Sequence, residues 1–264
     1  GAWRDGAKDL ISSEEKEEIK NIFGEGIDYY DEELIPISSS FYLYLSGTPF
    51  RAIGQGEFIE EQIYNWTYSD EQKAKQAWVG DDNPYKALAR MVLMTYQLPE
   101  VVRNIASQGE FNEFDLSAFF SASGEDRQAK FKFEYHVQKW LDLIRGSLIE
   151  TEVDNLKSGA QKPPFPFSDI RLRNILTHTL WFLPSIASCD AMKNLLAQEC
   201  NNFYHQYDII VAAGKKAGVG IHALKQVREK MSNPIKCKTI TLTCGKLLTG
   251  VSVAPWSGIF MLRN

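Results

Sequence analysis

Residues 239–253 read TITLTCGKLLTGVSV, and this stretch decides the predicted fold. Its first five residues mix threonine with isoleucine and leucine, and such residues favour a β-strand because they fit a pleated, half-buried surface. Gly245 and Gly250 flank the loop that follows, and a further apolar run begins after Gly258. The pattern therefore predicts a strand, a loop and a second strand.

The same rhythm extends back to Thr177. Hydrophobic periodicity and turn residues predict four strands, at 177–183, 207–213, 239–243 and 258–262. Helices are predicted between them at 189–200 and 221–231. Because strands and helices alternate, the sheet should be parallel with right-handed crossovers, which places the chain in the α/β class.

The middle of the chain is less regular. Apolar residues at helical spacing predict an amphipathic helix that faces a core, at Phe133, Val137, Trp140, Leu141 and Ile144. Earlier in the chain, residues 58–78 read as helical in parts, with Asp70 as the expected cap. The apolar run Met91–Tyr96 predicts a further strand.

A second notable stretch, Phe41–Arg51, reads FYLYLSGTPFR. Its five apolar or aromatic residues suit a strand that is buried on both faces of a parallel sheet, and Gly47 and Pro49 end that strand. Ligands of open α/β sheets bind beyond the carboxyl ends of the strands, so Ser46 and Thr48 are candidate site hydroxyls. An ordinary strand-to-loop turn is the alternative interpretation.

Together the two stretches resemble motifs III and V of superfamily 2 helicases, in the same order. Ser-Gly-Thr-Pro at 46–49 resembles motif III, and Thr-Gly-Val-Ser-Val at 249–253, after a strand and a loop, resembles motif V. The family that the chain resembles is the helicase subunit of type III-like restriction enzymes. The likeness covers about residues 1–54 and 170–264, and the middle third matches weakly.

The resemblance implies a RecA-like parallel sheet and three parts. Residues 1–54 would be the carboxyl-terminal part of a first RecA-like domain, 55–168 a linker with a partly helical insertion, and 169–264 a second RecA-like domain with motifs IV and V. The chain would begin after the family's motif II and end before its motif VI. The expected partners are DNA, the missing first RecA-like domain, and modification or nuclease modules of a parent protein.

The resemblance also implies site residues. Ser46, Gly47 and Thr48 would couple nucleotide state to domain closure. The loop that faces the nucleotide and the DNA backbone would comprise Thr243, Gly245, Thr249, Gly250 and Ser252. Contacts to the nucleic acid would come from Arg51, Lys215, Lys216 and Lys246. Many members of the family carry Asp where this chain has Ser252, so a carboxylate contact is not expected at that position.

Hydrolysis of a nucleoside triphosphate needs a phosphate-binding loop and a magnesium-binding carboxylate. The chain has two Gly-Lys pairs, at 214–215 and 245–246, but the glycine expected five residues before each is Ile209 or Ile240. ATP and Mg²⁺ are therefore expected to bind the parent protein, and neither is expected to bind tightly to this chain.

The net charge of −5 is unevenly distributed. Residues 1–35 hold four bases against eleven acids (−7), whereas residues 214–246 hold eight bases against one acid (+7). A basic stretch beside a motif V-like loop is the electrostatic pattern expected for phosphate contacts. A solvated helix face with loop lysines is the alternative interpretation.

The preferred function is part of an ATP-dependent DNA helicase or translocase of a restriction-modification system, which couples nucleotide state to binding of the DNA backbone. The alternative is a helicase-like protein-interaction or adaptor domain without ATPase activity, which the acidic amino-terminal part would suit. A nuclease is disfavoured, because Glu14-x-Lys16 lies on a predicted capped helix and Glu229-Lys230 has no spacer residue.

No apolar run reaches the length of a membrane span, so no membrane association is expected. The four cysteines show no C-x-x-C pairing, which favours free thiols in a reducing compartment and a cytoplasmic location.

Overall fold

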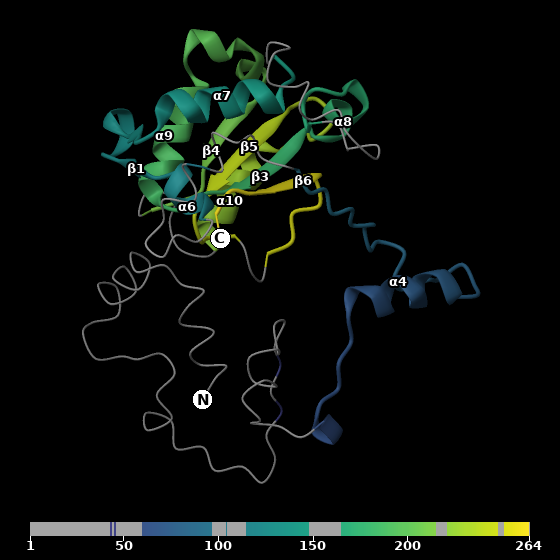
Figure 1. The fold of residues 1–264 in the computed structure, drawn as a ribbon. Coiled ribbons are helices and arrows are strands. Elements are labelled where there is room, and N and C mark those ends of the chain that lie inside the picture. Colours follow the sequence, from purple (N-terminus) through teal and green to yellow (C-terminus); the bar gives the residue numbers. More distant parts are fainter. Residues whose placement is uncertain are drawn as a thin grey trace. The chain divides into compact units, whose positions relative to one another are not determined.

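The computed structural model describes residues 60–96, 115–147, 165–214, 221–247 and 251–263, together with the single residues Leu43, Leu45 and Asn104. These residues belong to two compact units, with residues 60–95 in one and residues from Tyr96 onward in the other (Figure 1).

A four-stranded parallel sheet forms the centre of the larger unit (Figure 1). Its strands are β3 (His178–Phe182), β4 (Asp208–Val211), β5 (Thr239–Thr243) and β6 (Gly258–Met261). They lie in the order β4-β5-β3-β6, and every neighbouring pair is parallel. The predicted α/β class, the parallel sheet and the four strands are therefore confirmed, and a specifically RecA-like sheet stays a prediction.

Three helices of ten or eleven residues and several shorter elements complete this unit around the sheet. Two of these helices, α9 (Ile186–Leu196) and α10 (Ile221–Lys230), follow strands of the sheet. The elements before β3 are α6 (Leu116–Phe119), β1 (Ala122–Ser123), η2 (Asp126–Gln128), β2 (Lys130–Phe131), α7 (Glu134–Ile144) and α8 (Ile170–Ile175). The 3₁₀ segment η4 (Glu199–Gln206) connects α9 to β4.

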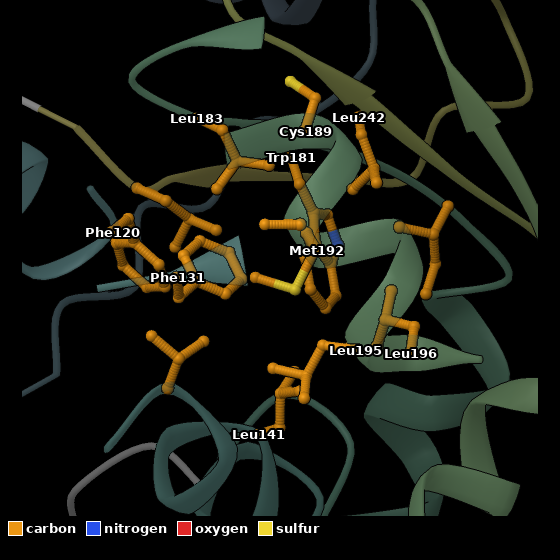
Figure 2. Close-up of a cluster of buried hydrophobic side chains, with 14 of the residues drawn as sticks. Phe120, Phe131, Leu141, Trp181, Leu183, Cys189, Met192, Leu195, Leu196 and Leu242 are labelled. Atoms are coloured by element: carbon orange, nitrogen blue, oxygen red, sulfur yellow. The ribbon is translucent and has the colours of Figure 1, made fainter. Parts of the chain in front are cut away.

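The larger hydrophobic core lies between the sheet and the helices α9 and α7. Figure 2 shows Trp181 of β3 and Leu242 of β5 beside Met192 of α9, with Leu141 of α7 nearby. Trp181, Met192, Leu141 and Leu242 have no measurable solvent exposure. The predicted amphipathic helix is therefore confirmed as α7, and it belongs to the same core as the sheet.

Polar contacts also hold α7 against the unit. The amides of Gln138 and Asn201 bond to each other in both directions, at 2.9 and 2.8 Å. The buried hydroxyl of Tyr204 donates to the Leu141 carbonyl oxygen at 3.0 Å. Because buried polar groups are costly unless paired, these bonds fix one position of α7 on η4.

The opposite face of the sheet is covered by α10. Successive side chains of a strand point to opposite faces, so Ile210 of β4 turns away from the larger core and packs with Val227 of α10 in a second cluster. The central strand β5 is buried on both faces, with Ile240 and Leu242 toward the larger core. Its threonines face the other side of the sheet.

The described part of the smaller unit contains η1 (Glu60–Gln62) and α4 (Tyr68–Ala77). Thr67, not Asp70, is the N-cap of α4, and Asp70 completes a capping box by accepting a bond from the Thr67 backbone N–H at 3.0 Å. The prediction that Asp70 is the cap was therefore wrong by three positions.

Two predicted strands differ from the structure. Residues 91–96 form no strand, and Leu93 is 87% exposed. Of the stretch 41–51, the structure describes Leu43 and Leu45, which lie outside any strand and are 84% and 86% exposed, and the rest of that predicted strand lies outside the described residues. An apolar run forms a buried parallel strand only beside partner strands, and the parallel strands of the described chain pair only with one another.

None of the described helices has the length and apolar character needed to cross a membrane.

Candidate functional site

The carboxyl edge of the parallel sheet is the position where open α/β sheets bind ligands. The strands lie in the order β4-β5-β3-β6. After β3 the chain crosses toward the β4 side of the sheet, whereas after the neighbouring strand β5 it crosses toward the β6 side. Such a reversal between two neighbouring strands marks the ligand-binding position of this fold class. The residues that follow β3, β4, β5 and β6 therefore form the candidate site.

Thr243 ends β5 and anchors the turn that follows it. Its side chain has no solvent exposure, and its hydroxyl lies between two backbone carbonyl oxygens, those of Ala212 at 3.1 Å and of Lys246. The single hydroxyl proton lies within hydrogen-bonding reach of both carbonyl oxygens. Thr243 therefore links the turn after β5 to the end of β4.

Lys246 makes a second link between the same two segments. Its Nζ donates to the carbonyl oxygen of Gly214 at 2.8 Å, and the side chain is partly buried. Gly214 has a φ of +67°, and a Cβ at that position would lie 3.1 Å from Ile186 Cγ2, at the start of α9. Glycine is therefore favoured at the point where β4, β5 and α9 meet.

A second cation, Arg263, lies at the same edge after β6. Its guanidinium stands 5.0 Å from the centre of the Phe182 ring, at the end of β3, and Nη1 lies 3.4 Å from the Cys244 carbonyl oxygen. Sequence reasoning missed Arg263, although its place directly after the predicted fourth strand indicated the same edge.

The segments that follow β4 and β5 are basic in sequence. No acid occurs in residues 212–220 or 243–263, whereas these two segments carry Lys215, Lys216, Lys246 and Arg263. Of these cations, Lys246 and Arg263 are described at the carboxyl edge, where positive charge attracts anionic groups such as phosphates.

The predicted site residues are only partly described. Thr243, Gly245 and Lys246 lie together at the carboxyl edge, and Ser252 is exposed in the connection to β6. Eight predicted residues lie outside the described part of the chain and stay predictions: Ser46, Gly47, Thr48, Arg51, Lys215, Lys216, Thr249 and Gly250.

The basic stretch 214–246 does not form a single patch in the structure. Lys238 precedes β5 and Lys246 follows it, so the five residues of the strand separate them by about 16 Å at 3.3 Å per residue. At the amino edge, Lys238 Nζ donates to Gln206 Oε1 at 2.7 Å, and Lys230 lies 3.9 Å from an Asp208 carboxylate oxygen. The amino edge thus carries an acid, Asp208, beside its cations, whereas the segments 212–220 and 243–263 carry none, so the carboxyl edge is the better candidate for an external anion.

The buried His178 belongs to the amino edge and has a structural role. Its Nε2 lies 2.8 Å from the Pro234 carbonyl oxygen and its Nδ1 lies 3.0 Å from Thr239 Oγ1. The ring therefore ties the connection after α10 to the sheet. Among the described residues, no three His, Cys, Asp or Glu side chains gather as a metal site would require.

Comparison with known proteins relates the chain to one protein of a restriction-modification system. The chain is similar to a protein of Mycoplasma pneumoniae named "Putative type II restriction enzyme and methyltransferase RM.MpnORF110P C-terminus", with 25% identity over 240 residues. The match covers 83% of this chain and 32% of that protein, so the chain spans about a third of its relative's length. No protein-family model and no solved structure matches the chain.

The similarity supports the restriction-system part of the predicted resemblance. The relative's name includes a restriction enzyme and a methyltransferase but no helicase, so the helicase part gains no support from it.

Proposed function

We propose that this chain is a DNA-binding part of a restriction-modification protein, and that it meets the DNA backbone at the carboxyl edge of its parallel sheet. The observation that carries the proposal is the bond from Lys246 Nζ to the Gly214 carbonyl oxygen. It joins the loop after β5 to the end of β4, and the segments that follow both strands are basic and free of acids.

DNA is the proposed partner because restriction and modification are reactions of DNA, and the similar Mycoplasma protein is named for both. Contacts from lysine and arginine to phosphates position a protein on DNA without reading its sequence. The carboxyl edge therefore supplies affinity, and recognition of a particular sequence would belong to other parts of the parent protein.

We extend the proposal to an ATP-dependent DNA helicase or translocase on the strength of the two stretches that resemble motifs III and V. In such a protein, residues 46–48 would couple nucleotide state to domain closure, and the turn after Thr243 would respond at the DNA. ATP and Mg²⁺ would be held mainly by other parts of the parent protein, because neither Gly-Lys pair of this chain completes a phosphate-binding loop.

A salt titration of DNA binding tests the proposal. Each lysine that meets a phosphate releases counterions, so the slope of log affinity against log salt should change by about one unit per contact. The double variant Lys215→Ala/Lys216→Ala should weaken binding of all duplex sequences alike and flatten the slope by up to about two units. These lysines are better targets than Lys246, whose ammonium also holds the Gly214 carbonyl.

The matched control is Lys16→Ala/Lys20→Ala, which removes two lysines from the segment that holds eleven acids. That variant should bind a labelled duplex with nearly unchanged affinity and slope. If the Lys215/Lys216 variant also leaves both quantities unchanged, the backbone-binding proposal is wrong and the protein-interaction alternative gains.

A further inference from the structure

The segment before α4 exposes two aromatic rings. Tyr64 is 84% exposed and Trp66 is 45% exposed, whereas Trp181 in the larger core has no exposure. Two neighbouring aromatic side chains that are exposed to solvent contribute little to packing. Contiguous exposed apolar surface of this kind marks interaction sites.

The two rings stand parallel and apart. Their planes differ by 8° and their centroids are 6.5 Å apart. In an extended chain, residues two positions apart point to the same side and are about 6.6 Å apart, at 3.3 Å per residue. Residues 63–67 belong to no helix, and Thr67 at the end of this stretch has extended backbone angles, which accounts for the spacing.

The centroid distance of 6.5 Å is the upper limit of the gap between the two ring planes, and this limit is close to the thickness of one inserted aromatic plane. Successive stacked bases of DNA are about 3.4 Å apart, so two planes that enclose one base are separated by about 7 Å. Stacking of bases on aromatic side chains is a common way to bind unpaired nucleic acid and does not depend on sequence, because every base has a π-face.

The geometry points to a slot between Tyr64 and Trp66 that binds one unpaired nucleobase. This inference rests on the proposed DNA-binding function and adds to it a contact to a base in place of a phosphate. Residues 60–96 hold four bases against six acids, so this segment is not a phosphate site. The contribution of the slot to binding should therefore be nearly independent of salt, unlike that of the carboxyl edge.

A planar guanidinium from a protein partner is the other group of suitable shape. An arginine bound between rings gains most from a carboxylate at its edge, which it meets in a bidentate bond. The carboxylate of Asp70, a few residues beyond the slot, is already engaged by the backbone N–H and the hydroxyl of Thr67. Glu61, three residues before Tyr64, is an exposed carboxylate, so free arginine is included as a competing ligand in the test.

The test compares binding of the full chain to a labelled oligothymidine, to an abasic strand of the same length and to a duplex. The variant Tyr64→Ala/Trp66→Ala should bind the oligothymidine about 5- to 150-fold more weakly, the range expected for the loss of base stacking. Its affinity for the abasic strand and the duplex, and its salt slope, should stay unchanged. The variant Tyr64→Phe/Trp66→Phe keeps both rings and should retain most of the affinity.

Trp78→Ala is the matched control, because Trp78 is 43% exposed in the same segment and should not affect binding of any of the three ligands. If the double alanine variant binds oligothymidine as the wild type does, while Lys215→Ala/Lys216→Ala weakens binding, the slot inference is wrong and the backbone proposal stands. If the wild-type chain binds none of the three ligands, both are wrong. Binding of free arginine but not of thymidine to the wild type, with that binding lost in Tyr64→Ala/Trp66→Ala, would assign the slot to a protein partner and overturn the inference.

Discussion

Replacing Thr243 by valine should destabilise the protein, although valine has nearly the same shape and is more apolar. Because the two side chains have nearly the same volume, the change opens no cavity at this fully buried position. It removes only the hydroxyl between the Ala212 and Lys246 carbonyl oxygens. A buried hydrogen-bonding group that loses its partner costs about 1–3 kcal/mol. We expect a loss of about 2 kcal/mol, which lowers Tm by about 4–8 °C in a unit of this size.

Thr241 provides an internal control on the same strand and the same face. It is equally buried, but its Oγ1 has no hydrogen-bond partner among the described residues. Because an unpaired buried hydroxyl is costly, Thr241→Val should leave the stability unchanged or raise it by about 1 kcal/mol. The same substitution two residues apart should therefore lower stability at position 243 and not lower it at position 241.

Urea denaturation followed by circular dichroism measures both variants against the wild type. A shift of the midpoint at constant slope reports a change in the free energy of unfolding. If Thr243→Val is as stable as the wild type, or if both variants shift in the same direction, the hydroxyl of Thr243 does not anchor the turn that carries Lys246.

Two further predictions concern the larger unit. Gly124→Ala should lower the free energy of unfolding by about 1–3 kcal/mol in a thermal melt, because Gly124 has a φ of +86° and a Cβ there would lie 2.7 Å from the Gln128 carbonyl oxygen; an unchanged Tm would contradict the turn geometry. Asp169 caps α8, and the Arg171 side chain, with the backbone N–H groups of Arg171 and Leu172, lowers its pKa from 3.8 to about 2. A lowered folded-state pKa adds stability above pH 3.8 that is lost as the pH falls toward about 2. The unfolding free energies of the wild type and Asp169→Asn, which keeps the cap, should therefore differ at neutral pH and converge below about pH 2; a pH-independent difference would show that the charge of Asp169 is not responsible.

The sequence predicted the sheet well because each strand is a dense apolar or β-branched run that ends at a turn residue. The strand predicted at 177–183 is observed at His178–Phe182, and the one predicted at 239–243 is observed at those residues. The run Met91–Tyr96 has the same local character but forms no strand. Local composition does not reveal whether a partner strand is present, and that information decides the outcome.

The candidate site was predictable where it depends on strand ends alone. Thr243, Gly245 and Lys246 follow a predicted parallel strand, so their position at the carboxyl edge followed from the fold class. The bond from Lys246 to Gly214 and the stacking of Arg263 on Phe182 join segments 32 and 81 residues apart, and both depend on the order of the strands. Sequence periodicity carries no information on that order.

The position of DNA on the sheet is the central claim, and site-specific photo-crosslinking tests it most directly. Gly245 follows Thr243 at the carboxyl edge and is partly exposed, whereas Ser232 lies after α10 close to Pro234 at the amino edge and is exposed. In a background with Cys200→Ser and Cys237→Ser, Gly245→Cys and Ser232→Cys each accept a thiol-reactive photo-crosslinker. We expect labelled duplex DNA to crosslink from position 245 and not from position 232. Crosslinking from position 232 alone, or equally from both, would place the DNA at the amino-edge lysines and contradict the account.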